Sequence, residues 1–525
     1  MSEDADNQQE VFGFLADPAT HGGEKVQRID THAASVFLAG DRAFKVKRAV
    51  RFPFLDYSTL EKRKEACEAE IAVNTPHAPE IYRGVVAITR EASGKLAIGG
   101  AGTPVEWAVD MRRFDETRTL DHITGEIDEA LADALGRAVA GAHTKKADGE
   151  PGIAPPAVAA DRWIAAIGTY IDEHIEAFGQ PPDIFPAANS DELARRSRTT
   201  YERIVPFLRE RGRRGFIRRI HGDLHLGNIV LIDGRPVLFD AIEFSDIIGS
   251  GDVFYDLAFL LTDLLERRLA PAANIVLNRY LTQTRRIENL DALATLPFFL
   301  SMRAAIRAKV TAARLERAAD ADRPSIGRAA RAYFDFAGRA IAPPRPAFVA
   351  IGGLSGTGKS VLARMLAPVV EPMPGAIVVR SDVERKALFG LSENEKLPSS
   401  AYTDEVNARV YAALGDKARR IVAAEHSVIV DAVFAKPEER AAMAEAAKSA
   451  RMPLQGLFLT ADTATRLSRV GGRVRDASDA DTAVAHAQER YELGRLEWAM
   501  IDASGTPEAT LTRAKAVLAA ASSSV

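Results

Sequence analysis

The sequence of 525 residues predicts two folded regions: an α+β region of two lobes, then an α/β region with a parallel sheet flanked by helices. β-like runs crowd residues 24–113, helical patterns dominate from about 128 to 340, and β-like and α-like runs alternate after a proline-rich stretch at 342–346. A small β-rich lobe beside a helical lobe is a bilobal arrangement, whose cleft is the natural ligand site. Alternation of strand and helix predicts a parallel sheet.

Composition and charge are those of a globular protein, with 47% hydrophobic and 27% charged residues. The net charge of −4 provides no overall basic field, which argues against nucleic acid or an anionic membrane as partner. The single cysteine, Cys67, excludes an internal disulfide and fits a reducing compartment. The N-terminus lacks a signal-peptide pattern, and the apolar patches are too short to cross a bilayer. We expect a cytoplasmic protein; its oligomeric state is not predicted.

The first lobe is expected over residues 24–113, after an N-terminal segment, 1–23, whose first part we expect to be poorly ordered. One helical stretch, 58–74, interrupts the strands, and Ser58 with Glu61 suits a capping box. The β-like runs are KVQRI, SVFLAG, AFKVK, YRGVVAITR, KLAIG and VEWAVDMRRF.

The second lobe, 114–341, is expected to be mostly helical. Only 217–240 interrupts it, with a loop and two short strands joined by the turn IDGRP. The linker APPRP, 342–346, is the predicted boundary, and 347–525 forms the last domain. Its alternating runs include AFVAIGG, KSVLARMLA, AIVVRSD, HSVIVDAVF and LQGLFLT.

The loop HGDLHLGN, 221–228, has the spacing D-L-x-x-x-N. Protein kinases place a catalytic aspartate and a magnesium-binding asparagine at this spacing, followed by a second metal carboxylate. We therefore expect Asp223 to orient or accept the proton of an attacking hydroxyl. Asn228 and Asp240, at the end of VLFD, would hold magnesium.

Two other interpretations of this loop remain open. It could be a polar turn, or His221 and His225 could be ligands of a catalytic metal, since imidazole and carboxylate are good ligands. We expect His221 instead to brace the loop by hydrogen bonds. Asp252 and Asp256, in GDVFYDLAF, are expected to brace the loop or cap a helix.

A lysine from the first lobe should steady the nucleotide phosphates and be held by a helix carboxylate. AFKVK offers Lys45 and the following helix offers Glu70, with Lys47 and Glu68 as alternatives. Because strand neighbours face opposite ways, we expect only one lysine to point into the cleft.

Residues 24–340 resemble the aminoglycoside phosphotransferase-like kinases, whose signature is an HGD–N loop followed by an aspartate. The resemblance implies a bilobal protein-kinase-like fold, magnesium, ATP with GTP as the alternative, and a small-molecule hydroxyl acceptor. Gly222 stands where protein kinases have arginine, and no APE-like segment follows Asp240, which argues against protein substrates. The first lobe departs from the kinase pattern because THAASVFLAG replaces a G-x-G-x-x-G loop.

The second motif, GLSGTGKS, follows an apolar strand and opens a helix, which is the setting of a phosphate-binding P-loop. Its glycines let backbone N–H groups turn toward phosphates at a helix N-terminus. Lys359 would reach the β- and γ-phosphates, and Ser360 would offer its hydroxyl to magnesium. The expected cradle comprises Gly353, Ser355, Gly356, Thr357, Gly358, Lys359 and Ser360.

Charged residues follow the next strands of this domain. Asp382 and Arg385 come just past AIVVRS, and Asp431 ends the strand of HSVIVDAVF, where a carboxylate can hold the magnesium or its water. The segment TRLSRVGGRVRDASDA concentrates arginines around two glycines, as in a mobile lid. Such arginines can neutralise the transferring phosphoryl group. They are Arg466, Arg469, Arg473 and Arg475.

Residues 346–525 resemble small P-loop kinases related to gluconate kinase, polynucleotide 5′-kinase, chloramphenicol phosphotransferase and zeta toxins. The resemblance implies that Asp382 is the acceptor base and that Arg469 and Arg473 are the lid arginines. Together the two halves predict a bifunctional ATP-dependent phosphotransferase. The alternatives are that one half is a nucleotide-sensing regulator of the other, or that the P-loop half is a nucleic-acid end kinase or a toxin-like kinase.

Overall fold

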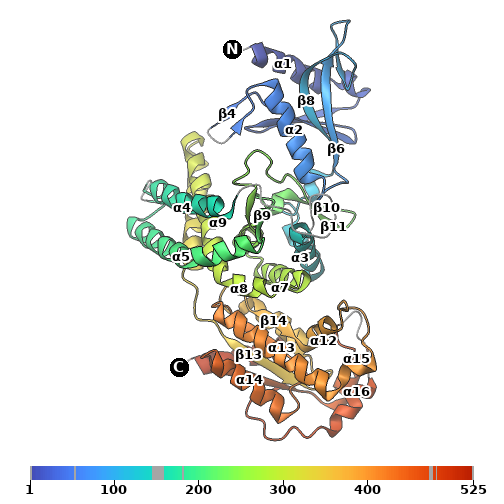
Figure 1. Cartoon of the computed structure of the whole chain (residues 1–525), viewed down its shortest axis with the longest axis vertical. Helices are drawn as coiled ribbons and strands as arrows, with labels where there is room; N and C mark the ends of the chain where they lie inside the picture. Colours follow the sequence, from blue (N-terminus) through green and yellow to red (C-terminus); the bar gives the residue numbers. More distant parts are fainter. Residues whose placement is uncertain are drawn as a thin grey trace. The chain divides into compact units, whose positions relative to one another are not determined.

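The computed structural model describes residues 3–52, 55–144, 159–179, 183–471, 477–479 and 482–522 (Figure 1). The chain divides into two compact units. The first comprises Met1–Asp263 and Met302–Phe334, and the second Leu264–Ser301 and Asp335–Val525. Among the described helices, none has the length and apolar character needed to span a bilayer.

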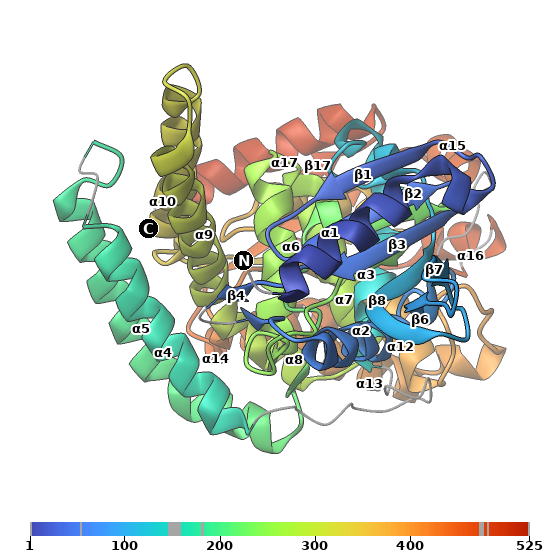
Figure 2. The same cartoon turned by 90° about the horizontal axis from the view of Figure 1, so that it is seen from above.

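The first unit begins with an antiparallel sheet whose six strands correspond to the six predicted β-like runs (Figures 1 and 2). The strand order is β1-β2-β3-β8-β6-β7, so the strand that carries Lys45 lies near the middle. The bounds are β1 Val26–Asp30, β2 Ala34–Ala39, β3 Arg42–Lys47, β6 Tyr82–Arg90, β7 Leu96–Ile98 and β8 Thr103–Arg112, with short strands β4 Arg51–Phe52 and β5 Leu55–Asp56 beside it.

Helix α1 (Glu3–Ala16) covers one face of this sheet (Figure 2). Val11, Phe12 and Leu15 are buried and pack in one cluster with Phe37 and Phe44. The N-terminal segment thus forms a helix from Glu3 onward that packs on the sheet through residues 11–15, whereas the expectation for residues 1–2 lies outside the described residues. Apolar residues at positions 11, 12 and 15 form one face of a helix, a signal that composition alone conceals.

Helix α2 (Leu60–Asn74) packs on β8 and β6. Its N-cap is Thr59, whose hydroxyl accepts from the Lys62 N–H, and not Ser58, which bonds Asp56 instead. Successive residues of a strand face opposite sides and alternate residues share a face, so Phe44 and Val46 both belong to the α1 face. Lys45 and Lys47 consequently both face α2.

The rest of the first unit is mainly helical, as predicted. The hairpin β10–β11 turns at Asp233 and Gly234, both with positive φ (49° and 74°), which suits the predicted turn IDGRP. The loop 221–228 lies between β9 and this hairpin. The elements are α3 Glu129–Thr144, α4 Ala160–Ala177, α5 Ala187–Arg213, β9 Ile217–Arg219, β10 Ile229–Ile232, β11 Arg235–Leu238, β12 Ser250–Asp252 and α6 Val253–Glu266.

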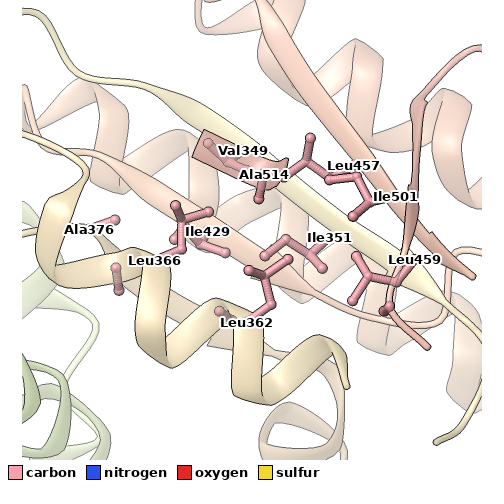
Figure 3. Packing of buried hydrophobic residues seen from close by; sticks show 13 residues of the cluster. Val349, Ile351, Leu362, Leu366, Ala376, Ile429, Leu457, Leu459, Ile501 and Ala514 are labelled. Atoms are coloured by element: carbon pink, nitrogen blue, oxygen red, sulfur yellow. The ribbon is translucent and has the colours of Figure 1, made fainter. Parts of the chain in front are cut away.

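The second unit contains a parallel sheet in the order β14-β15-β13-β16-β17. Helices flank it (Figure 1), and buried side chains of α11 and α17 pack against the central strands (Figure 3). The strands are β13 Phe348–Gly353, β14 Ile377–Arg380, β15 Val428–Asp431, β16 Leu454–Thr460 and β17 Ala499–Asp502. The helices after β13 are α11 Lys359–Leu366, α12 Ser381–Leu388, α13 Asp404–Ala423, α14 Pro437–Ser449, α15 Thr463–Gly471, α16 Thr482–Ala487 and α17 Pro507–Ser522.

Part of the helical sequence before the proline-rich linker also belongs to the second unit. Residues 264–301 include α7 Ala270–Thr284 and α8 Glu288–Asp291 and lead into α9 Leu296–Ala313, which precedes α10 Arg323–Ala340. The domain boundary expected at 342–346 stays a prediction. The compact units divide at other positions, between residues 263 and 264, 301 and 302, and 334 and 335.

Candidate active sites

The first unit brings the predicted lysine, its helix carboxylate and a predicted metal ligand together. Lys45 Nζ lies 2.9 Å from Glu70 Oε1 and 2.6 Å from Asp240 Oδ1. Burial would raise the pKa of Asp240, but the charge and hydrogen bond of Lys45 lower it to about 2. Asp240 also adopts a left-handed backbone conformation with φ 60°, which is unfavourable for this residue and typical of functional positions.

Lys47 is a second buried lysine on the same side of the strand. Its Nζ lies 2.5 Å from Glu70 Oε2 and also donates to Glu243. Tyr57 donates its hydroxyl to Glu243 at 3.0 Å. The expectation that only one lysine points into the cleft rested on treating Lys45 and Lys47 as strand neighbours, but residues two apart on a strand share a face, and both lysines contact Glu70.

The alternative carboxylate, Glu68, is exposed and lies 3.6 Å from Lys64. Glu70 is therefore the carboxylate that both lysines contact. Sequence reasoning did not single out Glu243, although its position three residues after Asp240 placed it near the site.

The loop 221–228 places its predicted base and metal ligand side by side. Asn228 Nδ2 donates to the Asp223 backbone oxygen at 3.0 Å and to its carboxylate at 3.2 Å. Burial acts to raise the pKa of Asp223, but the hydrogen bond and charge of His225 and the charge of Arg303 lower it below its ordinary value. Asp223 is thus held as a carboxylate.

Carboxylates of α6 hold the same loop. Asp256 accepts from the backbone N–H groups of His221 at 2.9 Å and Gly222 at 3.0 Å, which confirms the bracing role predicted for it. Asp263 accepts from the Leu226 N–H at 2.9 Å. Since these bonds fix the loop backbone, they fix the direction of the Asp223 side chain.

The two histidines of the loop contact backbone groups, one outside the loop and one within it. His221 Nε2 lies 2.9 Å from the Phe239 oxygen, and His225 Nδ1 accepts from the Gly227 N–H at 3.0 Å. Within the described part of the chain, no group of three or more His, Cys, Asp and Glu side chains could hold a metal ion. The oxygen donors Asn228 and Asp240 are of the type that magnesium prefers.

In the second unit, the phosphate loop runs from the end of β13 into α11, as predicted. Gly353, Gly356 and Gly358 have φ of 138°, 87° and 90°. A Cβ on Gly356 would lie 2.5 Å from the Arg466 backbone oxygen, so only glycine fits there without a backbone shift. Lys359 opens the helix, and its Nζ donates to the Leu354 oxygen at 3.2 Å.

The two predicted magnesium ligands of this unit contact each other. Ser360 donates its hydroxyl to Asp431 Oδ2 at 2.6 Å. Sequence reasoning missed Arg380, whose Nη2 donates to the Ser360 hydroxyl at 3.0 Å and whose Nε lies 3.3 Å from Asp431 Oδ2. The Arg380 guanidinium, at the end of β14, thus contacts the side-chain oxygens of both Ser360 and Asp431.

Asp382 lies in the first turn of α12, near this cluster. Burial raises the pKa of its carboxyl, and Asp431 acts in the same direction, whereas Arg380, Lys359 and a hydrogen bond from Ser478 oppose the shift. The result is a carboxyl with a pKa above the ordinary range. Such a group is a stronger base than an exposed aspartate.

Arg385, the other predicted catalytic residue of α12, is bound to the segment that precedes α13. Its Nη1 donates to the Ala401 oxygen at 2.7 Å, and its guanidinium lies 5.1 Å from the Tyr402 ring centre. Arg385 is buried, so its guanidinium is held by the segment before α13, and its catalytic role stays a prediction.

The lid arginines differ in their contacts. Arg469 donates to the backbone oxygens of Ala503 and Gly505, each at 2.8 Å, and Arg473 lies outside the described residues. Arg466 is buried and donates to the Ser355 oxygen at 2.9 Å, while Gln488 accepts from the Ser355 N–H at 2.7 Å. Arg466 and Arg469 thus both contact backbone oxygens, and the role of the lid arginines toward a phosphoryl group stays a prediction.

Separate family models match the two regions that contain the motifs. The family model described as the phosphotransferase enzyme family matches residues 27–294, and the one described as an AAA domain matches 348–493. Uncharacterized proteins of Mycobacterium tuberculosis and Mycobacterium bovis are 28% identical over 505 residues, which cover 92% of this chain and 94% of each relative.

Two solved structures are similar to parts of the chain. A gluconokinase from Sinorhizobium meliloti is 21% identical, covers 33% of this chain and 92% of its own, and has a TM-score of 0.26. A choline/ethanolamine kinase family protein from Mesorhizobium loti is 15% identical, covers 64% of this chain and 99% of its own, and has a TM-score of 0.38.

Proposed function

Because the chain belongs to the phosphotransferase enzyme family, we propose that it is a bifunctional kinase in which each half transfers the γ-phosphoryl group of ATP to a hydroxyl of a small-molecule acceptor. GTP is the alternative donor. One observation carries the proposal: each half has a lysine suited to phosphate and, beside it, an aspartate among oxygen donors suited to magnesium. These are Lys45 with Asp240 in the first half, and Lys359 near Ser360 and Asp431 in the second.

In the first half, Asp223 orients the acceptor hydroxyl and takes its proton as the oxygen bonds to the γ-phosphorus. The bond from that phosphorus to the β–γ bridging oxygen breaks, and ADP leaves with that electron pair. Lys45, held by Glu70, binds the donor phosphates. Asn228 and Asp240 would hold magnesium, which supplies charge neutralisation on the phosphates.

In the second half, Asp382 has the corresponding role and the phosphate loop binds the donor. Backbone N–H groups of the loop and Lys359 contact the phosphates, and Ser360 and Asp431 would hold magnesium. We add Arg380 to the predicted set, because it lies on the oxygens of both magnesium ligands. With magnesium held by those oxygens, Arg380 would add a positive charge beside the donor phosphates.

The test uses γ-labelled ATP, magnesium and a fractionated small-molecule extract, with wild type beside Asp223→Asn and Asp382→Asn. Two labelled products are expected, each reduced by about a hundredfold or more by one substitution, because positioning and proton transfer are lost while nucleotide binding remains. Label lost through only one substitution would restrict chemistry to that half and make the other half a nucleotide sensor. No product in any fraction, despite ATP binding, would contradict the small-molecule proposal.

A further inference from the structure

We propose that helix α7 positions the acceptor side of the second site, with Asn278 and Arg279 as its positioning residues. The proposal rests on the role proposed for Asp382 and adds an element that neither sequence motif contains. The helix belongs to the second compact unit, yet its sequence falls inside the 27–294 match to the phosphotransferase family. The P-loop half therefore uses a helix from the sequence of the other half.

Helix α7 pairs with the open edge of the parallel sheet (Figure 1). β14 is an edge strand, so the outward N–H and C=O groups of its chain need partners. The Val378 N–H donates to Asn278 Oδ1 at 2.7 Å, and Asn278 Nδ2 donates to the Ala376 oxygen at 3.2 Å. Asn274 Nδ2 donates to the same oxygen at 3.1 Å. The Asn278 amide thus takes the place of a peptide group from a neighbouring strand.

The same helix holds the chain on the far side of α12. Arg279 Nη1 lies 2.8 Å from Glu393 Oε1, and both side chains are largely buried. Arg285 Nη2 donates to the Leu391 oxygen at 2.8 Å. Because β14 runs directly into α12, helix α7 contacts the chain before and after the helix that carries Asp382.

Glu393 is in turn connected, through Lys386, to Asp479, which follows the predicted lid arginines in the sequence. Lys386, which is buried on α12, donates to the Glu393 backbone oxygen at 2.8 Å and lies 3.1 Å from Asp479 Oδ1. Asp479 also accepts from the Leu397 N–H at 3.0 Å. A displacement of the Arg279–Glu393 pair would therefore be transmitted through Lys386 to α12, the helix that carries the predicted base Asp382. A displacement of about 1 Å near a reacting group can reduce a rate by about a hundredfold.

The test uses the full chain with Asn278→Ala, Asn278→Asp, Arg279→Glu and the exchanged pair Arg279→Glu with Glu393→Arg. Pro271→Ala, on an exposed position of the same helix, is the matched control. The first readout is hydrogen exchange of peptides that cover 376–397, which requires no substrate. The second is the labelled product that depends on Asp382, measured over dilutions of its extract fraction and, separately, of MgATP.

We expect faster exchange across 376–397 in Asn278→Ala and Arg279→Glu, and a rate lower by about tenfold to a hundredfold at limiting acceptor. The KM for MgATP should change less than the rate at limiting acceptor, since the phosphate loop follows β13 and only Arg380 connects β14 to the predicted magnesium ligands. Asn278→Asp keeps an oxygen that accepts from the Val378 N–H, so its exchange and its rate should lie between those of wild type and Asn278→Ala. The exchanged pair should recover most of the wild-type rate.

Unchanged exchange in both Asn278→Ala and Arg279→Glu would overturn the proposal, as would an equal loss of MgATP affinity. If no product depends on Asp382, the proposed reaction fails, but the exchange data still decide whether α7 holds this segment. The two failures are therefore distinguishable.

Discussion

At the scale of single residues, the two predicted bases have opposite electrostatic surroundings. Asp223 lies near His225 and Arg303, which lower its pKa despite burial. For Asp382, burial and the neighbouring Asp431 raise the pKa against the influence of Arg380 and Lys359. A base works only when deprotonated, so each reaction should lose rate as pH falls through the pKa of its own aspartate.

We predict that the acid limb of the Asp382-dependent reaction lies at a higher pH than that of the Asp223-dependent reaction. The raised pKa makes Asp382 protonate first as pH falls, whereas Asp223 stays ionised to lower pH. The measurement is kcat/KM against pH for each labelled product. The reverse order of the two limbs would contradict the assigned bases.

We expect the two lysines of β3 to have different roles, with Lys47 supporting stability and Lys45 supporting nucleotide binding. Lys47→Met leaves Glu70 with Lys45 alone and Glu243 with only a tyrosine hydroxyl, so breaking this buried pair should lower the free energy of unfolding by about 3–5 kcal/mol. Lys45→Met should instead abolish nucleotide binding at the first site, with a smaller loss of stability, because Glu70 keeps Lys47.

Urea unfolding and ATP binding measured on the same variants check this prediction. Lys64→Met is the control, because Lys64 is partly exposed and its contacts, an ion pair with Glu68 and a position 4.9 Å from the Trp107 ring centre, are each expected to contribute about 0–1 kcal/mol. If Lys47→Met abolished ATP binding and left stability unchanged, the roles of the two lysines would be exchanged.

At the scale of elements, the phosphate loop is held by side chains from α15 and from the chain that follows α16. Arg466 on α15 binds the Ser355 oxygen, and Gln488, which follows α16, binds the Ser355 N–H. Arg466 also pairs with Glu489, so this one side chain connects α15, the phosphate loop and the chain after α16. The loop conformation therefore depends on these segments as well as on its own glycines.

We expect Gly356→Ala to weaken MgATP binding at the second site by about tenfold or more. The added Cβ would meet the Arg466 backbone at 2.5 Å, and alanine at φ 87° is strained by about 1–3 kcal/mol. Gly338→Ala is the control, since a Cβ there meets nothing within 4 Å. Unchanged MgATP affinity of Gly356→Ala would show that the loop tolerates a shift at this contact.

At the scale of the whole molecule, the chain should bind two nucleotides, one in each half. Equilibrium dialysis of labelled ATP with magnesium should give two per chain, falling to one in Lys45→Met or Lys359→Met and to none in the double variant. Each bound nucleotide should stabilise its own unit, by about 2.7 kcal/mol at a hundred times its Kd. One nucleotide per wild-type chain would contradict the bifunctional proposal.

Much of the fold and the local part of each site could be predicted from sequence. Six β-like runs predicted the six-stranded sheet, and strand–helix alternation predicted the parallel one. Asp223 and Asn228 are five residues apart and meet in one loop. The phosphate loop is likewise a single segment, so its glycines, Lys359 and Ser360 could be recognised together. Periodicity and local spacing contain this information because the residues concerned are covalent neighbours.

Contacts between distant segments could not be predicted in the same way. Glu243 meets Lys47 across 196 residues, Arg380 meets Asp431 across 51, and Asn278 meets Val378 across 100. A lysine, arginine or asparagine has many potential partners in the sequence, and packing alone selects among them. Chain order made the motifs and strands recognisable, whereas the second lysine, the added arginine and the helix that closes the P-loop sheet depend on side chains that meet only after folding.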